Sequence, residues 1–328
     1  MRPNHSISRD YVSRYAPILP ARGEPLVIGV VKGPNSDSLA KLLASRLDAK
    51  IIPVYKKVFP DGEIYVRICI DELDEPVNKI VVVASLYPRQ NDSIMETLLI
   101  TNALRNIGYT GVTAVIPYIA YSRQDKIFME GEPVSFEVIL STLSAMGIRK
   151  LVTVDVHSPI ALSTYFSGQS INVLVSDLLV KEALKYLENP VVLAPDKGAL
   201  NRAQYAAGAH GLEYDYLVKH RDRVTGEVSV EPKELSVRDR DVVIVDDIIS
   251  TGGTIALAAR ECLRNGARRV VVAVTHSLLV GDALKKIRGA GVFKLVTANT
   301  IPIEGDDFIE VVDISGRISD EIKRIMYS

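Results

Sequence analysis

Short apolar runs alternate with amphipathic stretches along the chain from residue 26 onward. The apolar runs are rich in Val and Ile and predict strands buried on both faces. These strands are expected at 26–31, 79–84, 112–116, 150–155, 191–194, 214–218, 242–245 and 270–274. Helical spacing predicts helices at 38–47, 92–106, 136–146, 177–187 and 198–207, and one from about 255 that closes at Gly266. The alternation predicts an α/β fold, with parallel sheets covered by helices.

Residues 50–55 and 63–70 also have strand patterns, but the second segment alternates apolar and polar residues. Such a strand has one face that is exposed or packed against a partner. Residues 118–133 form a long polar loop, and a loop of this length favours a function over a plain connection.

The length of 328 residues predicts two domains. The two halves resemble a degenerate duplication, because the strand at 79–84, the segment Ser85–Pro88 and a helix occupy the same place as the strand at 242–245 and its loop. We expect an extension at 1–24, an N-terminal domain at 25–175 and a C-terminal domain at 176–328.

Composition narrows the class of protein. The chain is 47% hydrophobic and 24% charged, as expected for a soluble globular protein, and its net charge of −1 predicts neither a nucleic-acid partner nor an anionic membrane. Cys69 and Cys262 are the only cysteines and form no CxxC pair, which favours reduced core residues of a cytoplasmic protein. No apolar run has transmembrane length, and the first residues do not resemble a secretory signal.

The stretch 241–254 carries the most distinctive chemistry. A buried strand leads into two adjacent carboxylates, Asp246 and Asp247. A loop of small and hydroxyl residues follows and opens a helix, and it consists of Ser250, Thr251, Gly252, Gly253 and Thr254. Glycine N–H groups, hydroxyls and a helix N-terminus together make a phosphate cradle. The carboxylates would repel a phosphate, so they suit sugar hydroxyls or Mg²⁺. A capped helix with no ligand is the alternative.

The corresponding segment of the first half, Ser85–Pro88, has no acidic pair and no Gly-Gly. We therefore expect that only the second half keeps a working ribose-phosphate site.

Four other stretches carry candidate chemistry. They are Phe59-Pro60-Asp61-Gly62-Glu63, Tyr121-Ser122-Arg123-Gln124-Asp125, Asp155-Val156-His157-Ser158-Pro159, and Ala194-Pro195-Asp196-Lys197-Gly198 with the later Lys219-His220-Arg221. Taken one at a time, each has an ordinary structural explanation. These explanations are a turn opening a hairpin, a solvated connection, a structural histidine and an exposed basic hairpin.

The loop at 241–254 closely resembles the phosphoribosyl diphosphate (PRPP) loop of type I phosphoribosyltransferases. All the motifs in their order resemble the ribose-phosphate diphosphokinase family, or PRPP synthetases, from about Val27 to about Ser315. The segment 128–133 is closer to the archaeal members of that family. The resemblance implies two domains of the type I phosphoribosyltransferase fold, each a mainly parallel sheet flanked by helices.

The resemblance also implies roles for individual residues. The residues implied in ATP binding are Phe59, Asp61, Gly62, Glu63, Arg123, Gln124, Asp125 and His157. Those implied in ribose 5-phosphate binding are Arg221, Asp246, Asp247, Ser250, Thr251, Gly252, Gly253 and Thr254. Those implied in catalysis are Lys219 and Arg221, on a mobile loop, and those implied at the metal are His157 and Asp196.

The implied reaction transfers the diphosphoryl group of ATP to the 1-hydroxyl of ribose 5-phosphate, with Mg²⁺ as cofactor. Its main obstacle is concentrated negative charge, so catalysis is mostly positioning and electrostatic stabilisation. The resemblance further implies a homo-oligomer, in which the segment at Phe59 completes the ATP site of a neighbouring subunit.

Three other functions use some of the same features. A phosphoribosyltransferase would need the loop at 250–254 but not the motifs at 59–63 and 123–125. A PRPP-sensing regulator would carry a DNA-binding segment and a basic face, and neither is seen in the sequence. A catalytically silent subunit would lose Lys219, Arg221 or His157, and this chain has all three.

Overall fold

The computed structural model describes residues 27–73, 75–221, 228–232 and 236–327. The described chain divides into two compact units. The first extends to Val173 and includes the segment that begins at Ser315, and the second is Leu174–Ile314. Each unit is an α/β domain, as the hydrophobic pattern predicts.

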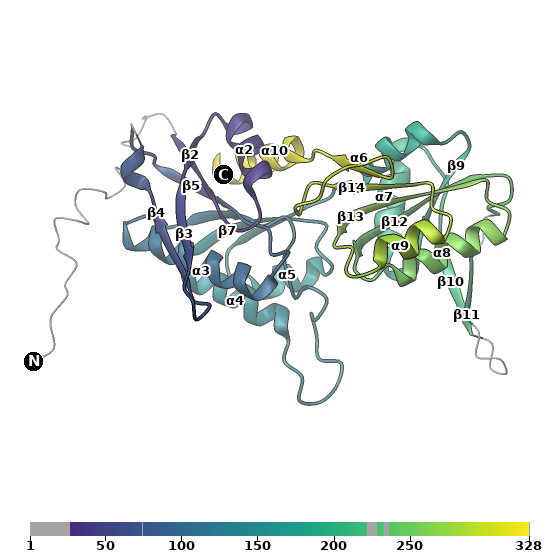
Figure 1. Ribbon diagram of the computed structural model, residues 1–328, viewed down its shortest axis with the longest axis horizontal. Helices are drawn as coiled ribbons and strands as arrows, with labels where there is room; N and C mark the ends of the chain where they lie inside the picture. Colours follow the sequence, from purple (N-terminus) through teal and green to yellow (C-terminus); the bar gives the residue numbers. More distant parts are fainter. Residues whose placement is uncertain (1–26, 74, 222–227, 233–235, 328) are drawn as a thin grey trace, which may run out of the picture. The chain divides into compact units, whose positions relative to one another are not determined.

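The first unit is built on a parallel sheet with the strand order β2-β1-β5-β6-β7-β8. Its strands are β1 (Ile28–Lys32), β2 (Lys50–Ile52), β5 (Lys79–Val83), β6 (Val112–Val115), β7 (Ile148–Val154) and β8 (Gln169–Val173). Helices α2 (Asp37–Leu47) and α10 (Ser315–Tyr327) cover one face of this sheet. The other face carries α3 (Gln90–Asn106), α4 (Ser135–Met146) and α5 (Pro159–Tyr165) (Figure 1).

A separate antiparallel hairpin joins β2 to β5. It consists of β3 (Val54–Val58) and β4 (Ile64–Ile68), followed by a short 3₁₀ turn, η1 (Ile70–Glu72). The sequence pattern predicts one strand at 50–55, but the structure has two, β2 and β3, with Pro53 between them. A proline has no N–H to donate to a ladder, which accounts for the break.

The second unit has the strand order β11-β10-β9-β12-β13-β14-β15, and only the β10–β11 pair is antiparallel. Its strands are β9 (Pro190–Ala194), β10 (Tyr214–Arg221), β11 (Val228–Pro232), β12 (Asp241–Ile249), β13 (Arg269–Ser277), β14 (Lys294–Ala298) and β15 (Ile309–Val312). One face carries α6 (Ser176–Ala183), η2 (Leu184–Tyr186), η3 (Lys197–Ala199) and α7 (Leu200–His210). The other carries α8 (Gly253–Arg264) and α9 (Ala283–Gly289) (Figure 1).

The two units repeat one topology, which supports the predicted duplication. The order β10-β9-β12-β13-β14-β15 in the second unit corresponds to β2-β1-β5-β6-β7-β8 in the first. Each unit also inserts a hairpin at the same point of the chain, β3–β4 in one and β10–β11 in the other. The strand β5 and its loop are therefore the counterpart of β12 and its loop.

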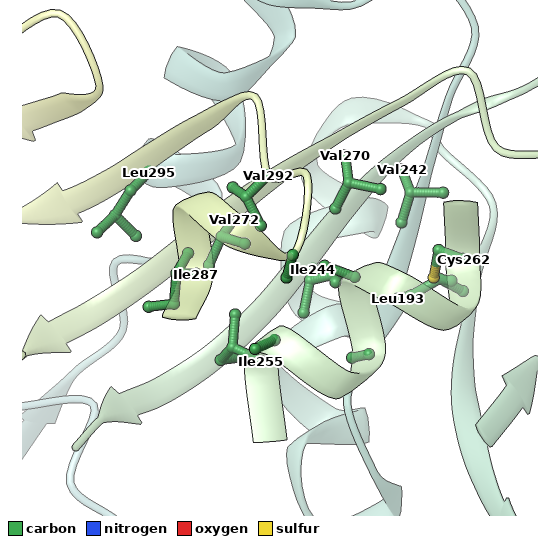
Figure 2. Close-up of a cluster of buried hydrophobic side chains, with 14 of the residues drawn as sticks. Leu193, Val242, Ile244, Ile255, Cys262, Val270, Val272, Ile287, Val292 and Leu295 are labelled. Carbon is green, nitrogen blue, oxygen red and sulfur yellow. The ribbon is translucent and has the colours of Figure 1, made fainter. Parts of the chain in front are cut away.

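The core that supports the second unit's loop lies between the sheet and helices α8 and α9. Figure 2 shows side chains of β12 and β13, such as Ile244 and Val272, packed against Ile255, Cys262 and Ile287 of the two helices. Burial raises the pKa of the Cys262 thiol to about 12, so this cysteine is a core residue rather than a nucleophile.

The final helix differs from the domain boundaries expected from the sequence, because α10 packs on the first unit and not on the second. Its residues Ile318, Ile322 and Ile325 are fully buried against α2, β7 and β8. Arg46 Nε also donates to Ser315 Oγ at 2.7 Å. The isoleucines recur at helical spacing, so this face needs an apolar surface, and α2 with the sheet provides one.

Several elements are not predicted by the sequence pattern, and others have bounds that differ from the prediction. The expected helix at 177–187 is α6 followed by η2, and the expected helix at 198–207 is η3 followed by α7. The sequence pattern does not identify α5, β8, β11, α9, β14, β15 or α10. Within the described residues, no helix combines the length and the apolar character needed to cross a membrane.

Candidate active site

The candidate site of the second unit lies where its strand order reverses. From β9 the chain goes to β10 on one side, returns to β12 on the other side of β9, and continues outward to β13. Open α/β sheets bind ligands at such a reversal, outside the carboxyl ends of the strands, so the loops after β9 and β12 form the candidate site. Asp196 follows β9, and Ser250–Thr254 follows β12.

The loop after β12 has the geometry of an anion cradle. Gly252 adopts the left-handed conformation, with φ of 75°, and is the residue from which α8 starts. The carbonyl of Ser250 accepts the N–H of Val280 at 2.9 Å, so the connection after β13 holds the loop in place. Thr251, Gly253 and Thr254 are exposed. N–H groups and hydroxyls at the start of α8 can therefore reach a phosphate, which the helix dipole also favours.

The acidic pair is inside β12 and not at its end. The expected strand stops at Val245, but β12 continues to Ile249 because β13 keeps pairing with it, placing Asp246 opposite Val274. Asp246 is half-buried and Asp247 is buried. The N–H of Asp247 donates to Asp246 Oδ1 at 2.9 Å.

A buried arginine that the sequence pattern does not single out contacts this pair. Arg202 of α7 places Nη2 3.3 Å from Oδ2 of Asp247, and the two side chains are 13% and 7% exposed. Burial, and then the charge of Asp247, raises the pKa of Asp246 well above its ordinary value, while the charge of Arg202 acts in the opposite direction. In the sequence, the only indication of this contact is that a basic residue, Arg202, lies in the first turn of the helix after the Asp196 motif.

Asp196 is exposed and has a fixed orientation. Its Oδ1 accepts the N–H groups of Gly198 at 2.8 Å and Ala199 at 3.3 Å, so it caps the turn η3. No group of three or more His, Cys, Asp or Glu side chains that could hold a metal occurs within the described ranges. Asp196 thus offers one oriented carboxylate, which fits Mg²⁺, an ion that prefers oxygen ligands and keeps much of its water.

The predicted catalytic pair lies on the hairpin of the second unit. Lys219 and Arg221 belong to β10, where they face Val230 and Val228 of β11 in the antiparallel register. Their side chains lie outside the described part of the structure, as does that of His220.

The first predicted ATP motif forms the tip of the β3–β4 hairpin. Phe59 donates its N–H to the carbonyl of Glu63 at 2.8 Å, and Glu63 donates its N–H to Asp61 Oδ1 at 3.1 Å. Gly62 has φ of 95°, which a glycine adopts without strain. Lys57 Nζ lies 4.9 Å from the centre of the Phe59 ring. The turn is an ordinary hairpin turn that presents an aromatic ring and two carboxylates to solvent.

The second ATP motif lies in the loop between β6 and α4. Arg123 is exposed, and Gln124 Oε1 accepts the hydroxyl of Ser135 at 2.5 Å. Asp125 is half-buried. The sheet that carries this loop is distinct from the two-stranded sheet of the 59–63 hairpin, so the structure does not unite the two ATP motifs in one sheet.

A polar cavity of about 540 Å³ adjoins the start of the 118–133 loop. Its lining comes from the start of α3 and from this loop, and consists of Arg89, Gln90, Asn91, Asp92, Tyr118, Ala120 and Tyr121. Tyr121 donates its hydroxyl to Asn91 Oδ1 at 2.6 Å. None of the predicted ATP residues lines this cavity.

His157 is exposed in the loop at the carboxyl end of β7. The preceding Asp155 is fully buried and has φ of 39°, and the N–H of Val156 donates to Asn172 Oδ1 at 2.8 Å. These contacts turn the chain out of the sheet, so that His157 reaches solvent.

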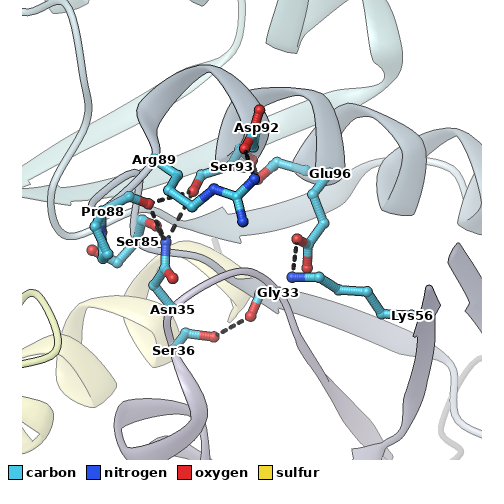
Figure 3. A network of polar contacts seen from close by, with 11 residues as sticks. Gly33, Asn35, Ser36, Lys56, Ser85, Pro88, Arg89, Asp92, Ser93 and Glu96 are labelled. Atoms are coloured by element: carbon cyan, nitrogen blue, oxygen red, sulfur yellow. Dashed lines mark hydrogen bonds and ion pairs between the residues drawn. The ribbon is translucent and has the colours of Figure 1, made fainter. Parts of the chain in front are cut away.

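In the corresponding place of the first unit, side chains bridge the two loops (Figure 3), and a pocket of about 50 Å³ remains beside Asn35, Pro88 and Ser93. Asn35 Nδ2 lies 3.0 Å from the carbonyls of both Ser85 and Pro88 and 2.9 Å from Ser93 Oγ. Ser36 donates its hydroxyl to the carbonyl of Val83 at 2.6 Å. These bonds join the loop after β1 to the loop after β5. That only the second half keeps a ribose-phosphate site stays a prediction.

Comparisons with known proteins agree with this geometry. The family model described as the N-terminal domain of ribose phosphate pyrophosphokinase matches residues 28–147, and that of the phosphoribosyl transferase domain matches residues 163–302. The ribose-phosphate pyrophosphokinase of Saccharolobus solfataricus is 40% identical over 291 residues, covering 88% of this chain and 98% of the relative. That of Pyrococcus furiosus is 42% identical over 254 residues, covering 77% and 88%.

Among solved structures, phosphoribosylpyrophosphate synthetase from Mycobacterium smegmatis superposes with a TM-score of 0.81 at 27% identity, covering 92% of this chain and 99% of that one. The expected fold and the resemblance to archaeal relatives are thereby confirmed. With such identity over nearly the full length of its relatives, the chain belongs to the ribose-phosphate pyrophosphokinase family.

Proposed function

We propose that the protein is a ribose-phosphate diphosphokinase, which transfers the diphosphoryl group of ATP to the 1-hydroxyl of ribose 5-phosphate and releases AMP. The chain belongs to this family, and one structural observation carries the proposal. The second unit has an anion cradle at Ser250–Thr254 and a carboxylate, Asp246, on the strand that leads into it. Ribose 5-phosphate carries both a phosphate and sugar hydroxyls, so it fits both parts.

The cradle and the carboxylate divide the sugar phosphate between them. The 5-phosphate lies against the N–H groups and hydroxyls of the loop, where the start of α8 stabilises its charge. The vicinal hydroxyls of the ribose donate to Asp246. Arg221 adds a cation on the ribose 5-phosphate side, and Asp247 belongs to the same site.

ATP binds through the motifs of the first unit. Arg123, Gln124, Asp125 and His157 bind the nucleotide. Phe59, Asp61, Gly62 and Glu63 hold the adenine of a neighbouring subunit in a homo-oligomer. The exposed hairpin tip supports this role. Its aromatic ring can stack on a base, and its carboxylates can accept hydrogen bonds from the amino group of that base.

The catalytic step places negative charge on the transferring group as the 1-hydroxyl attacks the β-phosphorus. Lys219 and Arg221, which belong to the β10–β11 pair, stabilise that charge, and we propose that this pair closes over the ligand and excludes water. The residues implied to hold Mg²⁺ are Asp196 and His157, and the ion would supply charge that neutralises the phosphates; as an ion that prefers oxygen ligands and retained water, it would need few protein ligands. We place the reaction in the cytoplasm, which suits the reduced, buried thiols of Cys69 and Cys262.

The deciding assay measures AMP released by the purified protein with ATP, Mg²⁺ and ribose 5-phosphate. AMP should form only when all three are present, in equal amount to PRPP. AMP release without ribose 5-phosphate, or PRPP consumption with a free purine base, would instead indicate an ATP pyrophosphohydrolase or a phosphoribosyltransferase. Light scattering on the same sample gives the mass of the homo-oligomer.

A further inference from the structure

The two adjacent carboxylates of β12 lie in different surroundings. Successive side chains of a strand point to opposite faces of the sheet, so Asp246 shares the face of Ile244, which packs toward α8 and α9. Asp247 shares the opposite face, where α7 lies and where its carboxylate meets Arg202 at 3.3 Å. Asp247 is thus engaged by α7, while Asp246 precedes it on the same strand, close enough that the two carboxylates act on each other.

The burial of the Asp247–Arg202 pair makes it energetically important. With side chains 7% and 13% exposed, neither charge is well solvated, and each compensates part of the charge of the other. The pair also bears on Asp246, because the N–H of Asp247 donates to Asp246 Oδ1 at 2.9 Å. A shift of residue 247 therefore changes the orientation of the neighbouring carboxylate.

We propose that Arg202 is a positioning residue for ribose 5-phosphate, which anchors Asp247 so that Asp246 alone presents its carboxylate to the sugar hydroxyls. Asp247 is then an internal anchor and not a sugar ligand. This inference rests on the proposed function, since it assigns the roles within the same site. Burial, and then Asp247, raise the pKa of Asp246, and the positive charge of Arg202 opposes that rise.

The same strand provides a matched control. At the amino end of β12, Asp241 pairs with Arg268 at 3.4 Å, and the Asp241 side chain is 6% exposed. This pair also joins an arginine to a buried aspartate of β12 at the strand end opposite the loop, although Arg268 is 43% exposed and Asp241 also accepts the N–H of Glu188 at 2.7 Å. Arg268→Met therefore measures how the fold responds when an aspartate of β12 loses an arginine partner far from the loop.

The experiment titrates ribose 5-phosphate by calorimetry into the intact wild-type protein, Arg202→Met, Arg202→Lys, the double variant Arg202→Met/Asp247→Asn, and Arg268→Met. Arg202→Met should bind at least about tenfold more weakly, the size of effect typical of coupled neighbours. Arg202→Lys should recover much of the affinity, and Arg268→Met should match the wild type. In the AMP assay, Arg202→Met should raise the KM for ribose 5-phosphate and leave the KM for ATP unchanged.

The double variant removes both buried charges, so it folds even if Arg202→Met does not. It should bind ribose 5-phosphate as weakly as Arg202→Met, because the anchor is already lost. Wild-type affinity in Arg202→Met or in the double variant overturns the inference, as does a double variant much weaker than Arg202→Met, which would make Asp247 a sugar ligand. A wild-type protein that binds no ribose 5-phosphate overturns the proposed function itself.

Discussion

At the scale of single residues, Asp246 shows how the proposed ribose 5-phosphate site opposes stability. A half-buried carboxylate beside a second carboxylate is unfavourable without a ligand, which is why the pKa of Asp246 is raised. Sugar hydroxyls donate to such a group and stabilise its charged form. The residue is thus better suited to the bound state than to the free one.

Asp246→Asn should weaken ribose 5-phosphate binding and stabilise the free protein. The folded chain holds a proton on Asp246 at pH values where the unfolded chain, with an ordinary pKa of 3.8, has lost it. The wild type therefore loses stability as pH rises from that value through the raised pKa, and the asparagine variant does not. The difference between the melting temperatures of the variant and the wild type should therefore grow, in favour of the variant, as the pH rises from 4 to 8.

Asp306→Asn is the control of opposite sign. The N–H groups of Ile309 and Phe308 lower the pKa of Asp306, so this carboxylate stabilises the fold above its ordinary pKa and loses that effect as pH falls. Its replacement should lower the melting temperature most at pH 8. A pH-independent difference in Asp246→Asn would contradict the assigned environment.

At the scale of elements, the start of α8 sets the shape of the phosphate cradle. Gly252 has φ of 75°, and a Cβ built there would lie 3.1 Å from the backbone oxygen of Ala283 and 3.2 Å from Ile287 Cγ1. Backbone and core atoms cannot move aside as an exposed side chain can. The turn therefore needs glycine on both conformational and steric grounds.

Gly252→Ala should destabilise the protein by at least about 1–2 kcal/mol, the penalty of a left-handed residue with a side chain. It should also weaken ribose 5-phosphate, because the loop must shift. Urea unfolding measures the first effect and calorimetry the second. Gly253→Ala controls for stability alone, since a Cβ there meets nothing within 4 Å, and its free energy of unfolding should be close to that of the wild type. Equal stability of the two variants would show that the turn tolerates a side chain.

At the scale of the whole molecule, the helix α10, which follows the second unit in the sequence, belongs to the first unit. Three fully buried isoleucines of α10, Ile318, Ile322 and Ile325, complete the first unit. Each contributes about 1.5–3 kcal/mol by burial, so together they approach the total stability of an ordinary domain, about 5–15 kcal/mol.

A chain that ends at Ile314 should therefore lose the first unit and keep the second. Hydrogen exchange should show early loss of protection in β7 and α2, with β13 and β14 still protected. Substitution of the exposed Asp320 by Asn should change neither pattern. Uniform loss of protection over both units would show that they fold as one cooperative unit.

The proposed oligomer gives a further prediction, because one subunit supplies Glu63 and another supplies Lys219. Glu63→Ala and Lys219→Ala should each be inactive alone. In a mixed two-fold pair, one site collects both lesions and the other collects neither, so roughly a quarter of all sites should recover after random mixing. The two variants are unfolded together, refolded and assayed for AMP release. No recovery in oligomers shown by mass to be mixed would place the adenine site within one chain.

The sequence by itself determined the features that depend on local pattern. The continuous apolar run at 242–245 predicts a buried strand, and the order of acids, hydroxyls and glycines after it predicts a phosphate cradle. The structure has the strand and, after the loop, a helix that starts at a left-handed glycine, because hydrophobic period and glycine content act over a few neighbouring residues. The phosphate cradle itself stays a prediction. The motifs at 59–63, 123–125 and 157 were also recognisable, but recognition located them without showing how they meet.

The tertiary structure alone decided what depends on distant residues. The extension of β12 to Ile249 follows from pairing with β13, and the pair of Arg202 with Asp247 joins residues 45 positions apart. Asn35 ties down a loop about fifty residues away, and α10 returns to the first unit. Such contacts form only after the chain has closed long loops. No local stretch of sequence specifies their partners, or the burial that makes them energetically important.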